Sequence, residues 1–381
     1  MKIAIIANGY PDKKEPQWGC FERDQALALS KMGHKVSILY VDGRFRKNWK
    51  NIGITCYNDN GLSIYGIFLI PLMGIGKISN KLHYRVVSKL LNQVYCVYTD
   101  KEGEPDVIYA HYLWNIAFAS LLKKNYHKPL IGIEHWSGMT KETLSQSERN
   151  IASIAYSNCD KLLVVSKSLQ AHIYRHFGKE SSVVYDMLGQ EFINTKFFSR
   201  DEHFFRFIAV GSLISRKGFD LLLGAFKKSK LAEKGCKVII IGDGPERERL
   251  QKQSELLCIS ETVEMVGRKT KKEIIRLLQE CHAFVLSSRA ETFGVVCIEA
   301  LSQGLPNIAT ICGGPEEFIN ENNGILIPPE DINALSDAMI RMYNNFQIYD
   351  SKAIADDCKQ RFSPQVIAKQ LADIFEKVTN T

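Results

Sequence analysis

Short apolar runs alternate along the chain with longer segments in which apolar residues recur every three or four positions. The first run, Lys2–Ala7, precedes a helical pattern that extends from Trp18 to about Met32, and the next run is Lys35–Val41. Buried parallel strands give continuous apolar runs of this length, and amphipathic helices give the longer spacing. The alternation therefore predicts βαβ units and parallel sheets.

The same alternation continues to the end of the chain, apart from a lapse of hydrophobic periodicity between residues 186 and 201. A chain of 381 residues is long for one core, so the lapse predicts a boundary between two α/β domains. Further strands are expected at Leu62–Leu69, Asp106–Ala110, Leu130–Ile133, Lys161–Val165, Ser182–Tyr185, Phe204–Val210, Lys237–Ile241, Val263–Val266 and Ala283–Leu286, with a last one beginning at Gly324.

Composition narrows the class of protein. Hydrophobic residues make up 45% and charged residues 24% of the chain, which favours neither a disordered nor a multi-span membrane protein. The apolar run at the start is too short for a secretory signal. The ten cysteines show no CxxC spacing, so we expect reduced core residues of a cytoplasmic protein. No HExxH motif or His/Asp cluster occurs, and no bound metal is expected.

The net charge is +7, and part of the excess of basic residues lies in two segments of the N-terminal half. Basic and aromatic surface suits an anionic membrane face, and an ordinary solvated surface is the equally weighted alternative. No nucleic-acid-binding motif accompanies these residues, so nucleic acid is not an expected partner. One segment places Arg44, Arg46, Lys47 and Lys50 around Phe45 and Trp49, and the other spaces Lys77, Lys81, Arg85 and Lys89 through an apolar helical pattern.

The stretch Ala283–Glu317 holds the densest set of chemical groups in the chain. After its strand, a polar turn contains Glu291, and a helix begins at Phe293-Gly294 and ends near Gly304. The start of a helix has unpaired N–H groups and a partial positive charge, and in an open α/β sheet such a turn binds ligands. We therefore expect an anion at the backbone amides of Phe293, Gly294 and Val295.

Two carboxylates stand near that anion site. Glu291 lies in the turn, and Glu299 lies eight residues later inside the helix, so they do not form a clustered pair. A carboxylate accepts two hydrogen bonds well, so Glu299 suits the hydroxyls of a ribose and Glu291 suits hydroxyls beyond the phosphates. This arrangement predicts a nucleoside-diphosphate-sugar. Two solvated glutamates beside an amphipathic helix are the alternative.

Two adjacent cations, Arg216 and Lys217, follow the expected strand Phe204–Val210 and precede Gly218 at the start of a helix. Arginine binds a phosphate through a bidentate fork and lysine binds it as a point charge. Together they could neutralise a diphosphate. A solvated surface is again the alternative.

The run Glu291-Thr-Phe-Gly-Val-Val-Cys-Ile-Glu299, followed by Gly304-Leu305-Pro306, resembles the E-x7-E signature of the retaining glycosyltransferase family 4. The resemblance extends from about Gly19 to Pro328. It implies an α/β fold of the GT-B type, with two Rossmann-like domains facing across a central cleft. The implied domains are an acceptor-binding domain over residues 1–190, completed by a C-terminal helix over 362–381, and a donor-binding domain over residues 200–361.

The resemblance also implies roles for single residues. His135 is similar to a family histidine that contacts the transferred sugar. Gly19 and Gly242 are similar to family glycines that border the donor, and Arg268 lies where the resemblance implies that the base stacks. Ser212 departs from the family, which commonly has arginine there. The expected catalytic residues are Glu291, Arg216, Lys217 and His135, and the expected donor-binding residues are Gly19, Gly242, Arg268, Phe293, Gly294, Val295 and Glu299.

Two further positions are left open. His111 follows the strand Asp106–Ala110 and is a candidate acceptor contact on position alone, with a packed histidine as the alternative. Family members usually carry Pro-Asn-Gly-Val-Asp where this chain has residues 185–194, so no contact is assigned to that segment.

These expectations combine into one function. The predicted reaction is retaining, metal-independent transfer of a hexosyl unit from a UDP- or GDP-type sugar to a hydroxyl of a glycan or lipid-linked acceptor. The expected setting is biosynthesis of capsule, exopolysaccharide or lipopolysaccharide in the cytoplasm, with peripheral contact to the inner membrane face. No cofactor is expected. The alternatives are a nucleotide-sugar epimerase on the same fold and a catalytically silent partner of a polysaccharide assembly complex.

Overall fold

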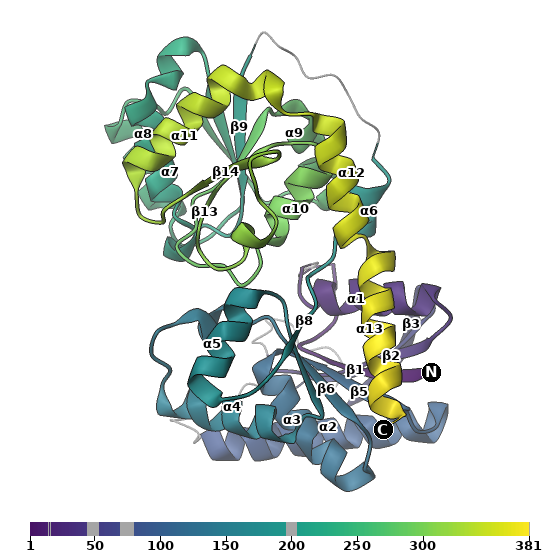
Figure 1. Cartoon of the computed structure of the whole chain (residues 1–381). Coiled ribbons are helices and arrows are strands. Elements are labelled where there is room, and N and C mark those ends of the chain that lie inside the picture. Colours follow the sequence, from purple (N-terminus) through teal and green to yellow (C-terminus); the bar gives the residue numbers. More distant parts are fainter. Residues whose placement is uncertain (14, 16, 44–52, 69–79, 196–203, 381) are drawn as a thin grey trace. The chain divides into compact units, whose positions relative to one another are not determined.

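The computed structural model describes residues 1–13, 15, 17–43, 53–68, 80–195 and 204–380. It divides into two compact units, Met1–Tyr185 with Pro364–Thr381 and Asp186–Ser363. The basic segment around Phe45 and Trp49 lies outside the described residues, as do Lys77 and the side chain of Lys81. Each unit is an α/β structure with its own sheet (Figure 1).

The first unit is built on an eight-stranded sheet in the order β3-β4-β2-β1-β5-β6-β7-β8. All neighbouring strands are parallel except the edge pair of β3 and β4. The strands are β1 (Lys2–Ala7), β2 (Lys35–Asp42), β3 (Ile54–Asp59), β4 (Leu62–Phe68), β5 (Val107–His111), β6 (Leu130–Glu134), β7 (Lys161–Val164) and β8 (Ser182–Val183). The helices are α1 (Cys20–Lys31), α2 (Asn80–Glu102), α3 (Tyr112–Tyr126), α4 (Gln146–Asn158), α5 (Lys167–Phe177) and α13 (Pro364–Thr379), with a 3-10 turn η2 (Ser137–Thr140).

The edge strand β3 is a departure from the sequence analysis, which predicted no strand there. Asn60 and Gly61 join β3 to β4, and both have positive φ angles, of 50° and 83°. Two positive φ angles in a two-residue loop are the requirement of a type I′ hairpin turn, which Asn-Gly meets. The pairing of Asp59 with Leu62 next to this turn sets the register of the hairpin.

The C-terminal helix α13 belongs to the first unit. Its Leu371 and Phe375 are fully buried, and the ring of Phe375 lies 4.9 Å from that of Tyr109 on β5. Figure 1 shows α13 beside α1 at the end of the chain. The amphipathic pattern of α13 therefore buries its apolar face against elements that are far away in sequence.

The second unit is built on a six-stranded parallel sheet in the order β11-β10-β9-β12-β13-β14. Its strands are β9 (Arg206–Val210), β10 (Lys237–Ile241), β11 (Val263–Gly267), β12 (Ala283–Leu286), β13 (Asn307–Thr310) and β14 (Gly324–Ile327). Its helices are α6 (Gln190–Ile193), α7 (Phe219–Ser229), α8 (Arg247–Leu256), α9 (Lys271–Glu280), α10 (Val295–Ser302), α11 (Ile332–Asn345) and α12 (Ser351–Phe362), with 3-10 turns η3 (Ser215–Lys217), η4 (Leu231–Lys234), η5 (Pro315–Glu317) and η6 (Phe346–Ile348).

The start of several helices follows from local side-chain hydrogen bonds. Ser145 and Glu148 form a capping box at α4, and Thr270 and Glu273 form another at α9. Such side chains satisfy N–H groups that the first turn of a helix leaves without a helical partner. In contrast, Gly294 precedes α10 with no side-chain cap, which leaves the N-terminus of that helix to backbone groups.

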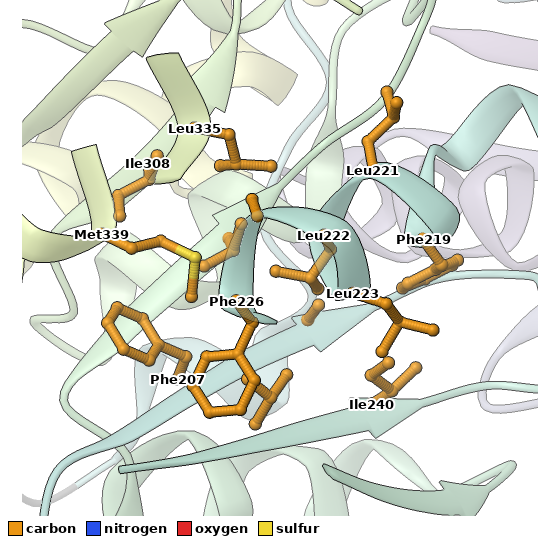
Figure 2. Packing of buried hydrophobic residues seen from close by; sticks show 14 of the residues in the cluster. Phe207, Phe219, Leu221, Leu222, Leu223, Phe226, Ile240, Ile308, Leu335 and Met339 are labelled. Carbon is orange, nitrogen blue, oxygen red and sulfur yellow. The ribbon is translucent and has the colours of Figure 1, made fainter. Parts of the chain in front are cut away.

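The core of the second unit lies between the sheet and the pair of helices α7 and α11. Phe207 from β9 and Phe226 from α7 are fully buried, and Met339 from α11 packs with them (Figure 2). Burying one large apolar side chain contributes about 1.5–3 kcal/mol to folding. This packing fixes α7, and with it the turn that precedes α7 at the end of β9.

Both sheets reverse their strand order beside their first strand. In the second unit β9 lies between β10 and β12, and in the first unit β1 lies between β2 and β5. Ligands of open α/β sheets bind beyond the carboxyl ends of the strands at such a switch point. A ligand-binding site of the second unit is therefore expected at the segments that follow β9 and β12.

Candidate functional site

The structure brings Arg216, Lys217 and Glu291 together at the switch point of the second unit. Lys217 Nζ donates to Glu291 Oε1 at 2.5 Å, and Arg216 Nη1 lies 3.4 Å from Glu291 Oε2. Arg216 Nη1 also donates to the carbonyl of Ala290 at 2.6 Å. Because the cations follow β9 and the carboxylate follows β12, the pairing of these two strands creates the cluster.

Glu291 is buried, with 6% of its surface exposed. Burial alone would raise the pKa of its carboxyl group, but the charge and hydrogen bond of Lys217, a hydrogen bond from Ser288 and the charge of Arg216 lower that pKa overall. Two cations and one carboxylate leave the cluster with one excess positive charge. The cluster therefore offers a net attraction to an anion.

Gly218 allows the two segments to lie against each other. It has a φ of 64°, and a Cβ atom there would stand 1.9 Å from the carbonyl oxygen of Ser287 at the end of β12. Ser287 Oγ in turn donates to the carbonyl of Lys217 at 3.2 Å. Only glycine permits this approach of backbone to backbone, so Gly218 holds the cations beside Glu291.

The turn after Glu291 leads directly into the N-terminus of α10. Gly294 has a φ of 93°, and its carbonyl accepts from the N–H of Cys297. The ring of Phe293 is fully buried against Phe318 and Phe362, with ring centroids 5.1 and 5.7 Å away. The ring anchors the turn, so any contact of Phe293 with an anion would come from its backbone, as the sequence analysis expected.

The other predicted residues of this unit lie along the same edge of the sheet. Glu299 is half-buried in the second turn of α10, and Gly242 follows β10. A Cβ atom on Gly242 would stand 1.8 Å from the carbonyl oxygen of Gly211, so close backbone packing requires glycine there. Arg268 is exposed after β11, which is separated from β9 by β10.

In the first unit, His135 follows β6 within a group of aromatic rings. Its ring stacks on that of His111 at 5.3 Å with an interplanar angle of 4°, and the ring of Tyr112 lies 5.1 Å away. His111 is fully buried, and burial together with the neighbouring His135 holds its pKa well below the ordinary value. Full burial favours the packed histidine, the alternative left open in the sequence analysis, over a contact of His111 with the acceptor.

A buried carboxylate fixes the backbone at His135. Glu134 Oε1 accepts from the N–H groups of His135 and Trp136 at 3.0 and 2.8 Å, and Oε2 accepts from the hydroxyl of Tyr156 at 2.8 Å. Burial raises the pKa of Glu134. These hydrogen bonds tie the segment after β6 to α4, so Glu134 supports the backbone on which His135 stands.

Gly19 caps α1 in the segment after β1, with a φ of 73°. A Cβ atom there would stand 2.4 Å from the carbonyl oxygen of Gly9. The backbone conformation alone therefore requires glycine at this position. Its contact with a donor stays a prediction, as do the contacts assigned to His135, Glu299 and Arg268.

Comparison with known proteins follows the same division of the chain. A model described as Glycosyltransferase Family 4 matches residues 23–186, and a model described as Glycosyl transferases group 1 matches residues 192–354. The two matches take in most of both units. The chain belongs to the family 4 glycosyltransferases.

Solved structures of similar fold extend over nearly the whole of this glycosyltransferase. Sucrose-phosphate synthase from Thermosynechococcus elongatus is 19% identical, with a TM-score of 0.79 and 99% of each chain covered. Anabaena Alr3699/HepE in complex with UDP is 17% identical, with a TM-score of 0.75 over 99% of this chain and 100% of that one. The predicted GT-B fold, with two Rossmann-like α/β domains, is confirmed.

A relative of similar sequence has the same extent. TuaC of Bacillus subtilis (strain 168), named provisionally as a teichuronic acid biosynthesis glycosyltransferase, is 24% identical over 409 residues and covers 100% of both chains. The prediction that this chain is a glycosyltransferase is confirmed.

Two features of the described residues bear on the partners of this family 4 glycosyltransferase. Within the described residues, no group of three or more His, Cys, Asp or Glu side chains could hold a metal ion. Nor does any helix in the described part of the chain combine the length and apolar character needed to cross a membrane.

Sequence reasoning missed two groups in the site of this glycosyltransferase. Ser288 Oγ donates to Glu291 Oε1 at 2.7 Å, and its place between β12 and Glu291 was a signal that could have found it. Arg289 donates through its guanidinium to Ser215, Asp220 and Glu330. No local signal marked Arg289, because its partners come from distant parts of the sequence.

Proposed function

We propose that this glycosyltransferase moves a hexosyl unit from a nucleoside-diphosphate-sugar to a hydroxyl group of an acceptor, with retention of configuration and without a metal ion. The observation that carries the proposal is the cluster of Arg216, Lys217 and Glu291 beside the start of α10. A diphosphate is the ligand that such a combination of cations and helix dipole attracts.

The solved relatives support a nucleotide donor. Structures of Anabaena Alr3699/HepE contain UDP or UDP-glucose, and the catalytic domain of Arabidopsis thaliana starch synthase IV is described with bound ADP. For this chain we propose a donor of the UDP or GDP type. Glu299 would bind the ribose hydroxyls, and Gly242 and Arg268 would border the nucleotide.

Positive charge at the diphosphate would also provide catalysis. As the glycosidic bond lengthens, negative charge grows on the leaving phosphate, so groups already aimed at it stabilise the transition state more than the ground state. Lys217 and Arg216 would supply this charge, together with the backbone amides of residues 293–295. Arg216 keeps capacity for a phosphate, since its contact with Glu291 is long at 3.4 Å.

The state of Glu291 supports a mechanism without a protein nucleophile. Its Oε1 atom already accepts hydrogen bonds from Lys217 and Ser288, which leaves Oε2 as the oxygen with more capacity for a sugar hydroxyl. A carboxylate held in this way suits binding better than attack on the anomeric carbon. We therefore propose attack of the acceptor from the face of the leaving phosphate, which would help to remove the acceptor proton.

The acceptor and its setting are proposed from similar proteins and from surface charge. O-antigen chain mannosyltransferase C of Escherichia coli is 26% identical over 226 residues, which are 58% of this chain and 55% of that one. This similarity favours cell-surface polysaccharide biosynthesis and a glycan or lipid-linked acceptor. Arg85 and Lys89 are exposed on one face of α2 with Leu82. This face supports peripheral contact with an anionic membrane on its cytoplasmic side.

Donor turnover followed by NMR tests the proposed reaction. The purified full chain is incubated in EDTA with UDP-glucose, UDP-N-acetylglucosamine, UDP-galactose or GDP-mannose, alone and with a panel of glycosides. We expect release of the nucleoside diphosphate from one donor and a first product with the donor's anomeric configuration. Inverted product or loss of turnover in EDTA would contradict the proposal, and a new nucleotide-sugar formed from donor alone would indicate an epimerase.

A further inference from the structure

Arg289 lies two residues before Glu291 and connects three parts of the second unit. Its guanidinium forms a bidentate pair with Asp220 in the first turn of α7, with Nη1–Oδ1 and Nη2–Oδ2 distances of 3.0 and 2.9 Å. Its Nε donates to Glu330, which precedes α11. Because α7 packs on the sheet, Asp220 holds the guanidinium from a rigid element, and Glu330 adds a contact from the exposed turn before α11.

The same residue bonds twice to the turn that carries the two cations. Arg289 Nη1 donates to the carbonyl of Ser215, and the backbone N–H of Arg289 donates to the carbonyl of Arg216 at 2.8 Å. In return, the guanidinium of Arg216 donates to the carbonyl of Ala290. The segments after β9 and β12 are thus joined by these hydrogen bonds in addition to the ion pair of Lys217 with Glu291.

The charge balance separates Arg289 from a phosphate-binding arginine. Two carboxylates contact its guanidinium, so its positive charge is compensated within the protein. The hydrogen bond to Asp220 raises the pKa of the Arg289 guanidinium. Burial alone would raise the pKa of Asp220, but the hydrogen bond and charge of Arg289 outweigh burial and lower that carboxyl pKa overall. Arg216, by comparison, has a single long contact with a carboxylate among the described residues.

We propose that Arg289, held by Asp220, is a positioning residue that fixes the Ser215–Lys217 turn so that Arg216 and Lys217 meet the donor diphosphate. This inference rests on the proposed function. Electrostatic catalysis depends on groups that are oriented before the reaction, and a misplacement of about 1 Å can cost about 10²-fold in rate. Loss of Arg289 is therefore expected to act on kcat more than on the KM for the donor.

Kinetics of variants test the proposal. Arg289→Ala is expected to lower kcat about 10²-fold, the scale of a small misplacement of catalytic groups. Asp220→Asn should produce a similar loss, and the double variant should lose less than the sum of both effects on a logarithmic scale, because the two residues act through one contact. Arg289→Lys should recover only part of the activity, since lysine cannot form the bidentate pair.

The matched control is Arg276→Ala, which removes an exposed ion pair with Glu280 within α9 and should leave kcat unchanged. Melting temperatures of all variants are measured in parallel, and the Arg289→Lys variant keeps the test informative if Arg289→Ala does not fold. A normal kcat in Asp220→Asn together with a loss in Arg289→Ala would overturn the positioning role, because it would indicate direct donor binding by Arg289.

The two hypotheses fail in different ways. If Arg216→Ala loses activity while Arg289→Ala and Asp220→Asn keep it, the positioning role is wrong and the proposed function stands. If Arg216→Ala itself keeps full activity, the proposed function is wrong at its basis. Donor KM values and kcat values are compared for each variant, because a purely structural weakening would lower the melting temperature without a selective fall in kcat.

Discussion

Replacing Lys217 with methionine is expected to lower kcat/KM for the donor by about 10²–10³, which corresponds to about 2.7–4 kcal/mol of transition-state stabilisation. Methionine keeps an unbranched apolar side chain but removes the ammonium group that lies 2.5 Å from Glu291. The side chain of Lys217 is 15% exposed, so water screens its charge only partly. Steady-state kinetics of the purified full chain measure this effect.

The control for this substitution is Lys228→Met in the last turn of α7. Lys228 is exposed and belongs to the same helix that follows the cation-bearing turn, so its loss should leave kcat/KM unchanged. An unchanged kcat/KM in Lys217→Met would contradict a role for this charge in catalysis. Equal losses in both variants would point instead to a general effect of net charge.

Replacing Glu291 with glutamine is expected to lower both activity and stability. The substitution leaves the partly buried ammonium of Lys217 without its carboxylate, and removal of one partner from a buried ion pair costs about 3 kcal/mol or more of unfolding free energy. Activity should fall as well, by about 10²-fold, because Lys217 and Arg216 lose the carboxylate that orients them. Melting temperature and kcat/KM are the two measurements.

The stability difference should depend on pH in a defined direction. The folded-state pKa of Glu291 lies below its ordinary value of 4.5, so its contribution to stability is fully present above that value. The contribution is lost as the pH falls through the folded-state pKa. The gap in melting temperature between the wild type and Glu291→Gln should therefore shrink in acid.

An exposed glutamate provides the control for the pH series. Glu264 on β11 pairs with Lys237 across the sheet edge, and both side chains are about half exposed. Glu264→Gln should change the melting temperature little at any pH, because surface ion pairs contribute only about 0–1 kcal/mol. A Glu291→Gln gap that stays constant or widens in acid would show that the carboxylate is not stabilised by its cations.

The sequence predicts most strands of the second unit well, because local apolar runs decide them. The strand ends and Gly218 led to the expectation that Arg216, Lys217 and Glu291 lie near each other, and the structure brings these three side chains together. The sequence did not predict that Glu291 contacts Lys217, because that contact requires β12 to lie beside β9 although β10 and β11 come between them in the chain. The sequence therefore indicated which residues belong to the cluster but not how they pair within it.

Two omissions have different physical origins. The turn Asn60-Gly61 between β3 and β4 could have been predicted from the sequence, since Asn-Gly is a strong signal for a two-residue hairpin. The strand β3 itself was missed because it is polar and lacks the apolar run of a buried strand. The contacts of Arg289 could not be predicted from the sequence, because Asp220 and Glu330 lie 69 and 41 residues away from it. Contacts at such separations follow from topology and not from local pattern.

The central claim is that Arg216 and Lys217 bind the donor diphosphate without a metal ion, and calorimetric titration of the full chain tests it most directly. UDP, GDP, ADP and the corresponding nucleosides are titrated in EDTA into the wild type and into the double variant Arg216→Ala/Lys217→Met. We predict that one diphosphate binds the wild type more tightly than its nucleoside does. The same diphosphate should bind the double variant at least 10-fold more weakly, which is a loss of about 1.4 kcal/mol or more of binding free energy. Equal diphosphate affinity in both proteins, or binding only after magnesium is added, would contradict the claim.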